Sequence, residues 1–277
     1  MIRRLTAHLC ANRDLGGGNH LAVFQAAEIA ACSRPAQFVM LKVRAGTDPL
    51  LGRPFSVARV GRQAGEPTLE ILYRVVGRGT ELLAGLAPGA KVGMVGPLGL
   101  PFPDPPGQEG PVFMVAGGIG IAPFPLLAET LKKRGRRCHL LYGGRSQRDL
   151  VALDLLAASG ASITLATEDG SRGFHGRVTD ILEAELLSLD AEQRRRSVSY
   201  VCGPAPMLAA VDDLLARHQA AGHLSMEGMM GCGFGVCLSC VVPVVDAQGQ
   251  PAGMRRICMD GPSFPAGRIH WKGSVAG

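Results

Sequence analysis

Four cysteines lie close together near the C-terminal end of the chain, in a spacing that suits a metal cluster. Cys232, Cys237 and Cys240 have four and two residues between them, and Cys258 follows after seventeen more. This C-x4-C-x2-C…C pattern is typical of plant-type [2Fe–2S] clusters, in which one loop wraps both irons. Glycines alternate with other residues at the start of this loop and permit a tight backbone path. The pattern predicts that these four thiolates hold a [2Fe–2S] cluster.

Zinc is the alternative occupant, because four thiolates also suit that ion. Structural zinc sites more often present two short cysteine knuckles, whereas here three ligands are consecutive and the fourth stands alone. Cys10, Cys32 and Cys138 are scattered singly, and we expect them to be buried free thiols. A disulfide framework is not expected, since the chain has 277 residues and no export segment is recognisable.

A short motif in the first third of the chain could bind a flavin. Arg53, Pro54, Phe55 and Ser56 open a predicted strand. An arginine here can bind a pyrophosphate, an aromatic ring can lie against the isoalloxazine, and a serine can hydrogen-bond the flavin N5 edge. On its own the motif is also compatible with an edge strand that carries a turn proline.

Two further motifs in the same region favour the flavin interpretation. Leu72, Tyr73 and Arg74 lie in a predicted strand, and Gly79 and Thr80 begin the one helix expected in this region. A helix N-terminus with a capping hydroxyl is a natural anion site. Together the three motifs predict a site for FAD.

A glycine-rich turn follows the first strand of the second part of the chain. It contains Gly117, Gly118, Ile119, Gly120 and Pro123. Glycines let the backbone approach a nucleotide phosphate, and the proline can sit in the first turn of a helix. The turn is not the G-x-G-x-x-G fingerprint of dinucleotide-binding proteins, and alone it is weak evidence.

Three later strand ends add turns of the same kind. The residues that we expect to contact a dinucleotide there are Gly143, Arg145, Glu168, Asp169, Cys202, Gly203, Pro204 and Met207. Each turn alone could be an ordinary connection, but four in succession favour a nucleotide cleft at the carboxyl ends of parallel strands. The arginine among them could pair with a 2′-phosphate, a pyrophosphate or a surface carboxylate, so NADP stays open beside NAD.

The elements that must position these motifs change character along the chain. Residues 1–107 alternate apolar and polar side chains, as in 37–44 and 68–76, between glycine and proline turns, with one helix at 80–86. This alternation predicts an antiparallel β-barrel, here the FAD domain. A proline- and glycine-rich linker, residues 100–110, is expected to follow it.

The rest of the chain divides into two further predicted domains. Residues 108–222 alternate strands with helices, which predicts an α/β domain with a parallel sheet that binds NAD. Its last helix is expected at 207–221. Residues 223–277 form the small [2Fe–2S] domain, which has too few residues for a core of its own and needs a metal centre or a docking surface.

The motifs together resemble a known family. Arg-Pro-Phe-Ser, Gly-Thr, Gly-Gly-Ile-Gly-Ile-Ala-Pro and Cys-Gly-Pro are similar to the ferredoxin–NADP reductase superfamily over about residues 1–222. One departure is Phe55, where that superfamily often has tyrosine. The segment from Glu227 through the four cysteines to Phe264 resembles the electron-transfer subunits of NAD-dependent (class B) dihydroorotate dehydrogenases.

This resemblance implies an FAD and [2Fe–2S] subunit that pairs with an FMN-containing catalytic subunit, in a heterotetramer. It implies that dihydroorotate is oxidised on the partner, that single electrons cross the cluster to FAD, and that a hydride passes to NAD+, in pyrimidine biosynthesis. Ser56 would steady the flavin N5 and Cys202 would lie near the nicotinamide, although Cys202 could equally be a small buried hydrophobe. The same module could instead serve a glutamate synthase, sulfite reductase or hydrogenase type of partner.

Charge and hydropathy bear on the remaining partner classes. The formal charge is +6, but the cations are scattered, and the densest group, residues 132–137, ends a predicted helix where cations offset the helix dipole. With no basic and aromatic motif, a nucleic-acid partner is not expected. The uncharged stretch 111–128 is broken by glycines and prolines, so we expect no membrane span. No apolar run of signal-peptide length begins the chain, which predicts a cytoplasmic protein.

Overall fold

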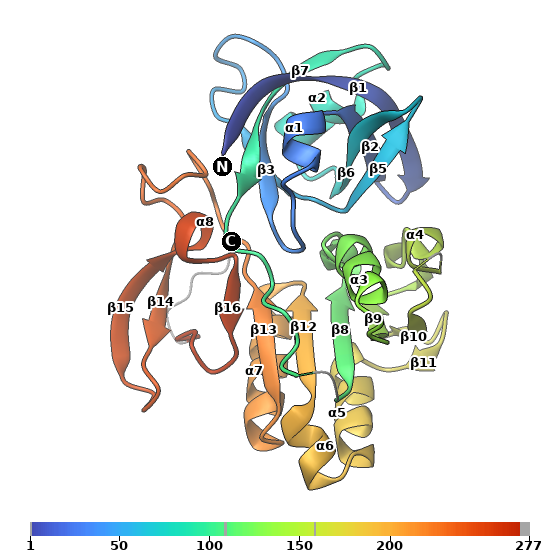
Figure 1. The fold of residues 1–277 in the computed structure, drawn as a ribbon, viewed down its shortest axis with the longest axis vertical. Coiled ribbons are helices and arrows are strands. Elements are labelled where there is room, and N and C mark those ends of the chain that lie inside the picture. The colour runs from blue at the N-terminus through green and yellow to red at the C-terminus, as the bar shows by residue number, and fades with distance from the viewer. Residues whose placement is uncertain (1, 108–109, 158, 272–277) are drawn as a thin grey trace.

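The computed structural model describes residues 2–107, 110–157 and 159–271. Two seven-stranded sheets and a two-stranded hairpin form its framework (Figure 1). The first sheet lies in the N-terminal part of the chain, the second in the middle, and the hairpin near the C-terminal end. No helix among the described residues is long and apolar enough to cross a membrane.

The first sheet is antiparallel throughout, with the strand order β4-β3-β7-β1-β2-β6-β5. Its strands are β1 (Arg3–Gly16), β2 (Asn19–Gln25), β3 (Phe38–Lys42), β4 (Arg53–Ser56), β5 (Arg59–Gln63), β6 (Glu66–Arg74) and β7 (Lys91–Leu98). In β6 the alternate residues Leu69, Ile71 and Tyr73 are buried in one core, as the period of two in the sequence predicts. The barrel expected from the alternation is confirmed.

Two short helices accompany this sheet, α1 (Ala27–Ala30) and α2 (Arg78–Ala84). The expectation of a single helix is therefore wrong, because four residues are too few to show a helical period in the sequence. The expected helix at 80–86 begins two residues earlier, at Arg78.

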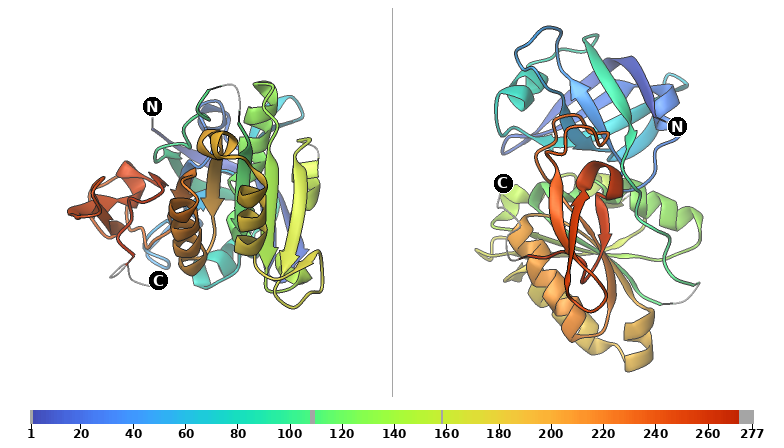
Figure 2. Two further views of the ribbon diagram at one scale, coloured as in Figure 1. Left: turned by 90° about the horizontal axis from the view of Figure 1, so that it is seen from below. Right: turned by 90° about the vertical axis from the view of Figure 1, so that its left-hand side faces the viewer.

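The second sheet has the order β11-β10-β9-β8-β12-β13-β16, and all its pairings are parallel except the last. Its strands are β8 (Val112–Gly117), β9 (His139–Gly144), β10 (Ser162–Thr167), β11 (Phe174–His175), β12 (Val198–Cys202), β13 (Ala221–Ser225) and β16 (Ser263–Pro265). Helical segments connect them: η1 (Gly118–Ile121), α3 (Phe124–Lys133), η2 (Gln147–Asp149), α4 (Leu153–Ala157), α5 (Val178–Ser188), α6 (Ala191–Arg196) and α7 (Ala205–Arg217). Helices α3 and α4 pack on one face and α5 and α7 on the other, which confirms the predicted α/β architecture (Figure 2).

The last helix differs from its prediction. α7 ends at Arg217, and Gln219 has a φ of 53°, in the left-handed region that terminates helices. The alanines that follow looked helical in the sequence, but Ala221 begins β13. The boundary predicted at residue 222 therefore falls inside a strand of the second sheet.

The C-terminal segment packs onto the second sheet and reaches the first. Its hairpin consists of β14 (Val241–Val245) and β15 (Pro251–Arg256), and α8 (Ile257–Asp260) follows. Val242, Ile257 and Phe264 share a core with Leu224 of β13. In Figure 2 this segment lies across the junction of the two sheets. A segment too short for its own core is thus ordered by docking.

Candidate functional site

A cleft of about 690 Å³ opens where the carboxyl ends of the parallel strands meet the first sheet. Most residues predicted to contact a dinucleotide line it, together with one residue predicted for the flavin. The predicted residues that line it are Arg74, Gly117, Gly118, Ile119, Gly120, Gly143, Arg145, Glu168, Gly203, Pro204 and Met207. The structure therefore brings four separate turns to one cavity, as the rule for open parallel sheets requires.

Glycines shape the wall of this cleft because neighbouring groups leave no room for side chains. A Cβ atom on Gly120 would lie 2.4 Å from the carbonyl oxygen of Cys202, and one on Gly117 would lie 2.5 Å from the sulfur of Met207. Gly118 differs, since its φ is +52° and a Cβ there would meet nothing within 4 Å. Gly120 packs against the end of β12, Gly117 packs against Met207 of α7, and Gly118 leaves backbone exposed to the cleft.

Three predicted residues do not line the cleft. Cys202 is 1% exposed, and burial raises the pKa of its thiol. The carboxylate of Asp169 faces solvent and accepts a 2.9 Å hydrogen bond from the amide of Ser171. Pro123 occupies the N-cap position of α3. The burial of Cys202 favours the small buried hydrophobe among its two interpretations.

Other residues of the cleft were not among the site residues predicted from the sequence. They are Gly144, Asp149, Arg177, Val178, Thr179, Pro206, Ala210 and Glu227. Arg177 is the N-cap of α5, a helix that the sequence did not reveal. Glu227 lies two residues beyond the end of β13, and its exposed side chain lines the cleft.

The three flavin motifs come together where the two ends of the first sheet approach each other, a place that we call the flavin edge. β4 is an edge strand, with no hydrogen-bonded neighbour on its outer side among the described strands. β6 lies against β4, and its pairing with β5 stops at Glu70, so the segment 71–74 also has a free edge. A Cβ on Gly79 would lie 3.0 Å from Nε of Arg53, so this arginine passes over the start of α2. The edge backbone of β4 and of residues 71–74 therefore lies beside the side chain of Arg53.

Several side chains of these motifs are used in packing. Phe55 is 8% exposed, and its ring edge meets Tyr73 at a centroid distance of 5.8 Å. The hydroxyl of Tyr73 donates to Oδ1 of Asn12 at 3.0 Å, and Leu72 packs in the core shared with the second sheet. The side chains of Leu72 and Tyr73 are therefore occupied, and only their backbone remains for a ligand.

Of the remaining flavin residues, some have side chains free for a ligand and one has its side chain used within the protein. Pro54 and Ser56 are half-buried and alternate with Phe55 along the strand, so they face away from its core. Thr80 is not the N-cap that the sequence predicted, since that position belongs to Gly77. Its hydroxyl accepts from the amides of Val76 and Gly77, at 2.9 and 3.1 Å, and donates to the carbonyl of Gly77. Thr80 therefore holds the turn before α2 with its hydroxyl, instead of offering that hydroxyl to a ligand as the sequence predicted.

The four predicted cluster ligands lie in two pairs, carried by one loop and one short helix. The thiol of Cys237 interacts with that of Cys232, and the thiol of Cys258 interacts with that of Cys240. The amide of Ile257 donates to the carbonyl of Cys240 at 2.8 Å and joins α8 to the loop. Two close pairs of thiols suit two irons with two thiolates each, so the residues fit a [2Fe–2S] cluster.

Groups around these thiols tune their protonation. A hydrogen bond with the hydroxyl of Ser239, at 3.2 Å, lowers the pKa of Cys237 to about 6. Burial raises the pKa of Cys258 to about 12, while the amide of Gly235 hydrogen-bonds it and acts in the opposite direction. Amides that reach ligand sulfurs in this way are a common feature of iron–sulfur loops.

The cysteine loop contacts the flavin edge through β3. A Cβ on Gly233 would lie 2.5 Å from Cγ of Met40, so the loop backbone lies directly on this side chain. Met40 is opposite Pro54 in the pairing of β3 with β4. The loop that carries Cys232 is thus one strand away from the predicted flavin motif.

Comparison with known proteins defines first the class of this protein. Residues 114–213 match the oxidoreductase NAD-binding domain, and residues 227–270 match the iron–sulfur cluster binding domain of dihydroorotate dehydrogenase B. The structure of an NADH-dependent reduced ferredoxin-NADP oxidoreductase is similar, with a TM-score of 0.81, 24% identity, and coverage of 96% of this chain and 90% of that one. The chain is an NAD(H)-dependent oxidoreductase with a ferredoxin reductase-like fold and an iron–sulfur segment.

Curated relatives then give the particular family. The electron transfer subunit of dihydroorotate dehydrogenase B (NAD(+)) from Desulforamulus reducens is 38% identical over 90% of this chain and 91% of its own length. The subunit of that name from Bacillus caldolyticus is 40% identical over 85% of this chain and 86% of its own. The chain belongs to this family of electron transfer subunits. Its cofactors are FAD, a [2Fe–2S] cluster and NAD, which decides against zinc.

Proposed function

We propose that this chain connects a catalytic subunit that oxidises dihydroorotate to NAD+, by way of its cluster and its FAD. The observation that carries the proposal is the continuity of the three sites. The cysteine loop touches β3, β3 pairs with the flavin strand β4, and Arg74 of the flavin sheet lines the dinucleotide cleft. When bound, FAD supplies the conversion between single electrons and a hydride.

Each part of the chain has a proposed role in this arrangement. Residues 1–107 would bind FAD, residues 108–222 would bind NAD, and residues 223–277 would hold the cluster, although β13 belongs to the NAD sheet. Arg53 would bind the pyrophosphate of FAD, and the free backbone edges of β4 and β6 would hold the isoalloxazine ring. Ser56 would hydrogen-bond the flavin N5. The cytoplasmic location expected from the sequence stays a prediction.

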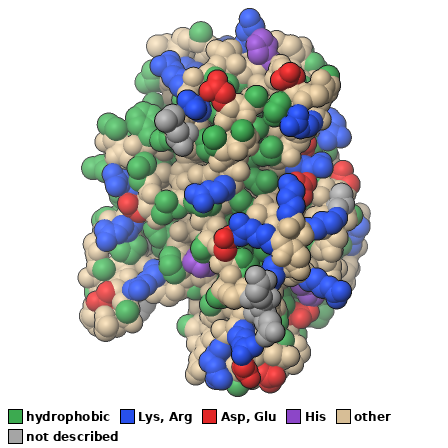
Figure 3. All heavy atoms as spheres, in the orientation of Figure 1, with side chains coloured by type: hydrophobic (Ala, Val, Ile, Leu, Met, Phe, Trp, Pro, Cys, Tyr) green, Lys and Arg blue, Asp and Glu red, His purple; other side chains and the backbone are tan. Residues whose placement is uncertain are grey.

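The surface around the cysteine loop is proposed to receive the catalytic subunit. Hydrophobic side chains gather over this loop in Figure 3. We call the following exposed residues the apolar collar: Met229, Phe234, Val236, Leu238, Met254 and Met259. Large apolar side chains that face solvent together mark a protein interface. The partner proposed here contains FMN, and the proposed assembly is a heterotetramer.

Loss of one cluster ligand tests this function. In Cys237→Ala, NADH oxidation with an artificial acceptor that takes electrons from flavin should persist, because hydride exchange needs only FAD and the cleft. Reduction of NAD+ by dihydroorotate in the reconstituted complex should fall by at least about 100-fold, since the path between the subunits is broken. Cys32→Ala is the matched control, because Cys32 lies outside the cluster and is an exposed thiol, not the buried one expected from the sequence.

Assembly must be measured in the same samples, since the cysteine loop also carries the apolar collar. If the Cys237→Ala subunit binds its partner and dihydroorotate still reduces NAD+ at the wild-type rate, the proposed path through the cluster is wrong. If NADH oxidation is lost together with dihydroorotate turnover, the variant is unfolded, and Cys258→Ser then replaces it in the same assay.

A further inference from the structure

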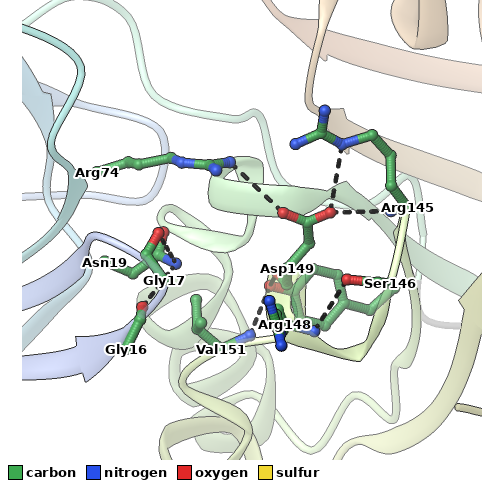
Figure 4. Close-up of polar contacts among 10 residues, drawn as sticks. Gly16, Gly17, Asn19, Arg74, Arg145, Ser146, Arg148, Asp149 and Val151 are labelled. Carbon is green, nitrogen blue, oxygen red and sulfur yellow. Dashed lines mark hydrogen bonds and ion pairs between the residues drawn. The ribbon is translucent and has the colours of Figure 1, made fainter. Parts of the chain in front are cut away.

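One ion pair joins the flavin sheet to the nucleotide sheet at the cleft. Arg74 is the last residue of β6, and Asp149 lies in the turn after β9. Nη1 of Arg74 is 3.5 Å from Oδ1 of Asp149, and the carboxylate is only 12% exposed (Figure 4). Both residues line the cleft.

The same carboxylate organises the turn that contains it. Oδ2 of Asp149 accepts a 3.0 Å hydrogen bond from the amide of Arg145 and lies 3.5 Å from its Nε. The buried hydroxyl of Tyr142 donates to the carbonyl of Asp149 and accepts from the amide of Val151, at 2.9 and 3.0 Å. The 145–151 turn is therefore fixed to its own sheet at one side and to Arg74 at the other.

A hairpin of the flavin sheet also lies against this turn. A Cβ on Gly17, between β1 and β2, would lie 3.4 Å from the carbonyl oxygen of Arg148. The buried amide group of Asn19 donates to the carbonyl of Gly16 at 3.1 Å and fixes the shape of the hairpin. Figure 4 shows the two turns facing each other beside Arg74. The turn after β9, which forms one wall of the cleft, is thus supported by the first sheet.

We propose that Arg74 is a positioning residue for NAD(H). Through Asp149 it holds the 145–151 turn where the dinucleotide needs it, so the affinity for NAD(H) depends on a residue of the flavin sheet. This inference rests on the proposed function only in placing NAD in the cleft. A loosened turn should weaken NADH binding and leave the rate at saturation nearly unchanged, because bound NADH restores the position of the turn.

A double-mutant cycle on the FAD- and cluster-loaded chain tests the proposal. Asp149→Asn removes the charge that faces Arg74 but keeps an oxygen that can accept from the amide of Arg145. Asp149→Asn should raise KM for NADH by roughly fivefold with kcat within about twofold, because Asp149 lies outside the flavin motifs. Arg74→Gln should raise KM by a similar factor wherever FAD is retained, and the double variant should raise KM no further than either single variant. Arg74→Lys should restore most of the affinity. Arg217→Gln, which breaks an exposed 2.9 Å pair with Glu183 away from the cleft, is the control that should change nothing.

The absorbance of bound flavin shows whether a variant has lost FAD, and so distinguishes that loss from a change in KM for NADH. If Arg74→Gln loses FAD, Asp149→Asn and Arg74→Lys alone decide, since Asp149 does not belong to the flavin edge. Single effects that multiply in the double variant, or an unchanged KM in Asp149→Asn, would overturn the proposal. Gly118→Val separates this failure from a failure of the proposed function. If that variant also leaves NADH oxidation unchanged, the cleft is not the NAD site.

Discussion

The dinucleotide cleft and the cysteine loop are built in opposite ways. The cleft is walled by glycine turns at the ends of buried strands, with charged side chains such as Arg145 and Glu168 at its rim. The loop at 226–240 has no regular secondary structure and exposes large apolar side chains, with Met229 82% and Val236 75% exposed. The first suits a small charged ligand that enters and leaves, and the second suits a resident cluster beneath a protein interface.

This difference shows how one small chain can exchange a hydride with a small ligand at the cleft and electrons with another protein at the cysteine loop. β13 joins the two regions, since it pairs with the Cys202 strand and leads directly into the cysteine loop. The flavin edge lies between them. Changes on one side should therefore affect one exchange and spare the other.

The largest expected effect is on the cleft side. Gly118→Val places a branched side chain in the open space of the cleft, and NADH should reduce the flavin at least about 100-fold more slowly in rapid mixing. Cluster absorbance and partner binding should be unchanged. Gly135→Val is the control, because Gly135 also has a positive φ, +70°, and open space around it, but lies at the end of α3. Equal flavin reduction in both variants would show that the glycine turn serves structure alone.

The next effect concerns the flavin edge, which both regions need. Arg53→Ala should weaken FAD binding by about 2 kcal/mol, or roughly 30-fold in Kd, the scale of a charge-assisted hydrogen bond. Fluorescence titration of the apoprotein measures this change. Arg62→Ala is the control, since Arg62 lies on β5 and donates to the carbonyl of Gly65, away from the flavin motifs. An unchanged affinity in Arg53→Ala would remove this residue from the FAD site.

A smaller effect is expected on the loop side. Val236→Asp places a charge in the apolar collar and should weaken association with the catalytic subunit by about tenfold, because the charge would lose water in the interface. NADH oxidation with an artificial acceptor should be unaffected. Leu187→Asp is the matched control, since Leu187 is 62% exposed on α5, away from the loop. Equal binding by the two variants, measured by analytical ultracentrifugation, would contradict this location of the interface.

The smallest effect concerns the strand that joins the two regions. Burial lowers the pKa of His223 on β13 below its ordinary value, because the charged ring loses water. The folded state therefore favours the neutral ring, so its contribution to stability is present above about pH 6.5 and is lost as the pH falls through the lowered pKa. His223→Gln should lose less Tm than the wild type between about pH 7.5 and about pH 5.5. Parallel losses of Tm would show that another group governs the acid side.

The sequence predicted the architecture and which residues would lie together at the cleft and in the cysteine loop, for physical reasons. Periodicity reveals strands, and the carboxyl ends of parallel strands must meet, so Gly118, Glu168 and Gly203 could be assigned to one cleft from the sequence alone. Cysteine spacing is a local property, and the pairs formed by Cys232 and Cys258 with their neighbours follow from it.

The sequence could not predict which way a side chain faces, nor which residues far apart in the chain come into contact. A motif does not show which way its side chains face, so Leu72 and Tyr73 were expected at the ligand but are packed in two cores. Thr80 was expected to cap a helix but holds its own turn. The pairing of Arg74 with Asp149 joins residues 75 positions apart, and no periodicity reports such a contact.

An anaerobic reaction of NADH with the wild-type chain tests the central claim most directly. Stopped-flow absorbance should show the flavin bleached first, and rapid freezing should then show the electron paramagnetic resonance signal of a reduced cluster within the time of one turnover. The account predicts both events in one chain, since the cysteine loop lies against the strand that pairs with the flavin motif. A flavin that is fully reduced while the cluster stays oxidised through many turnovers would contradict it.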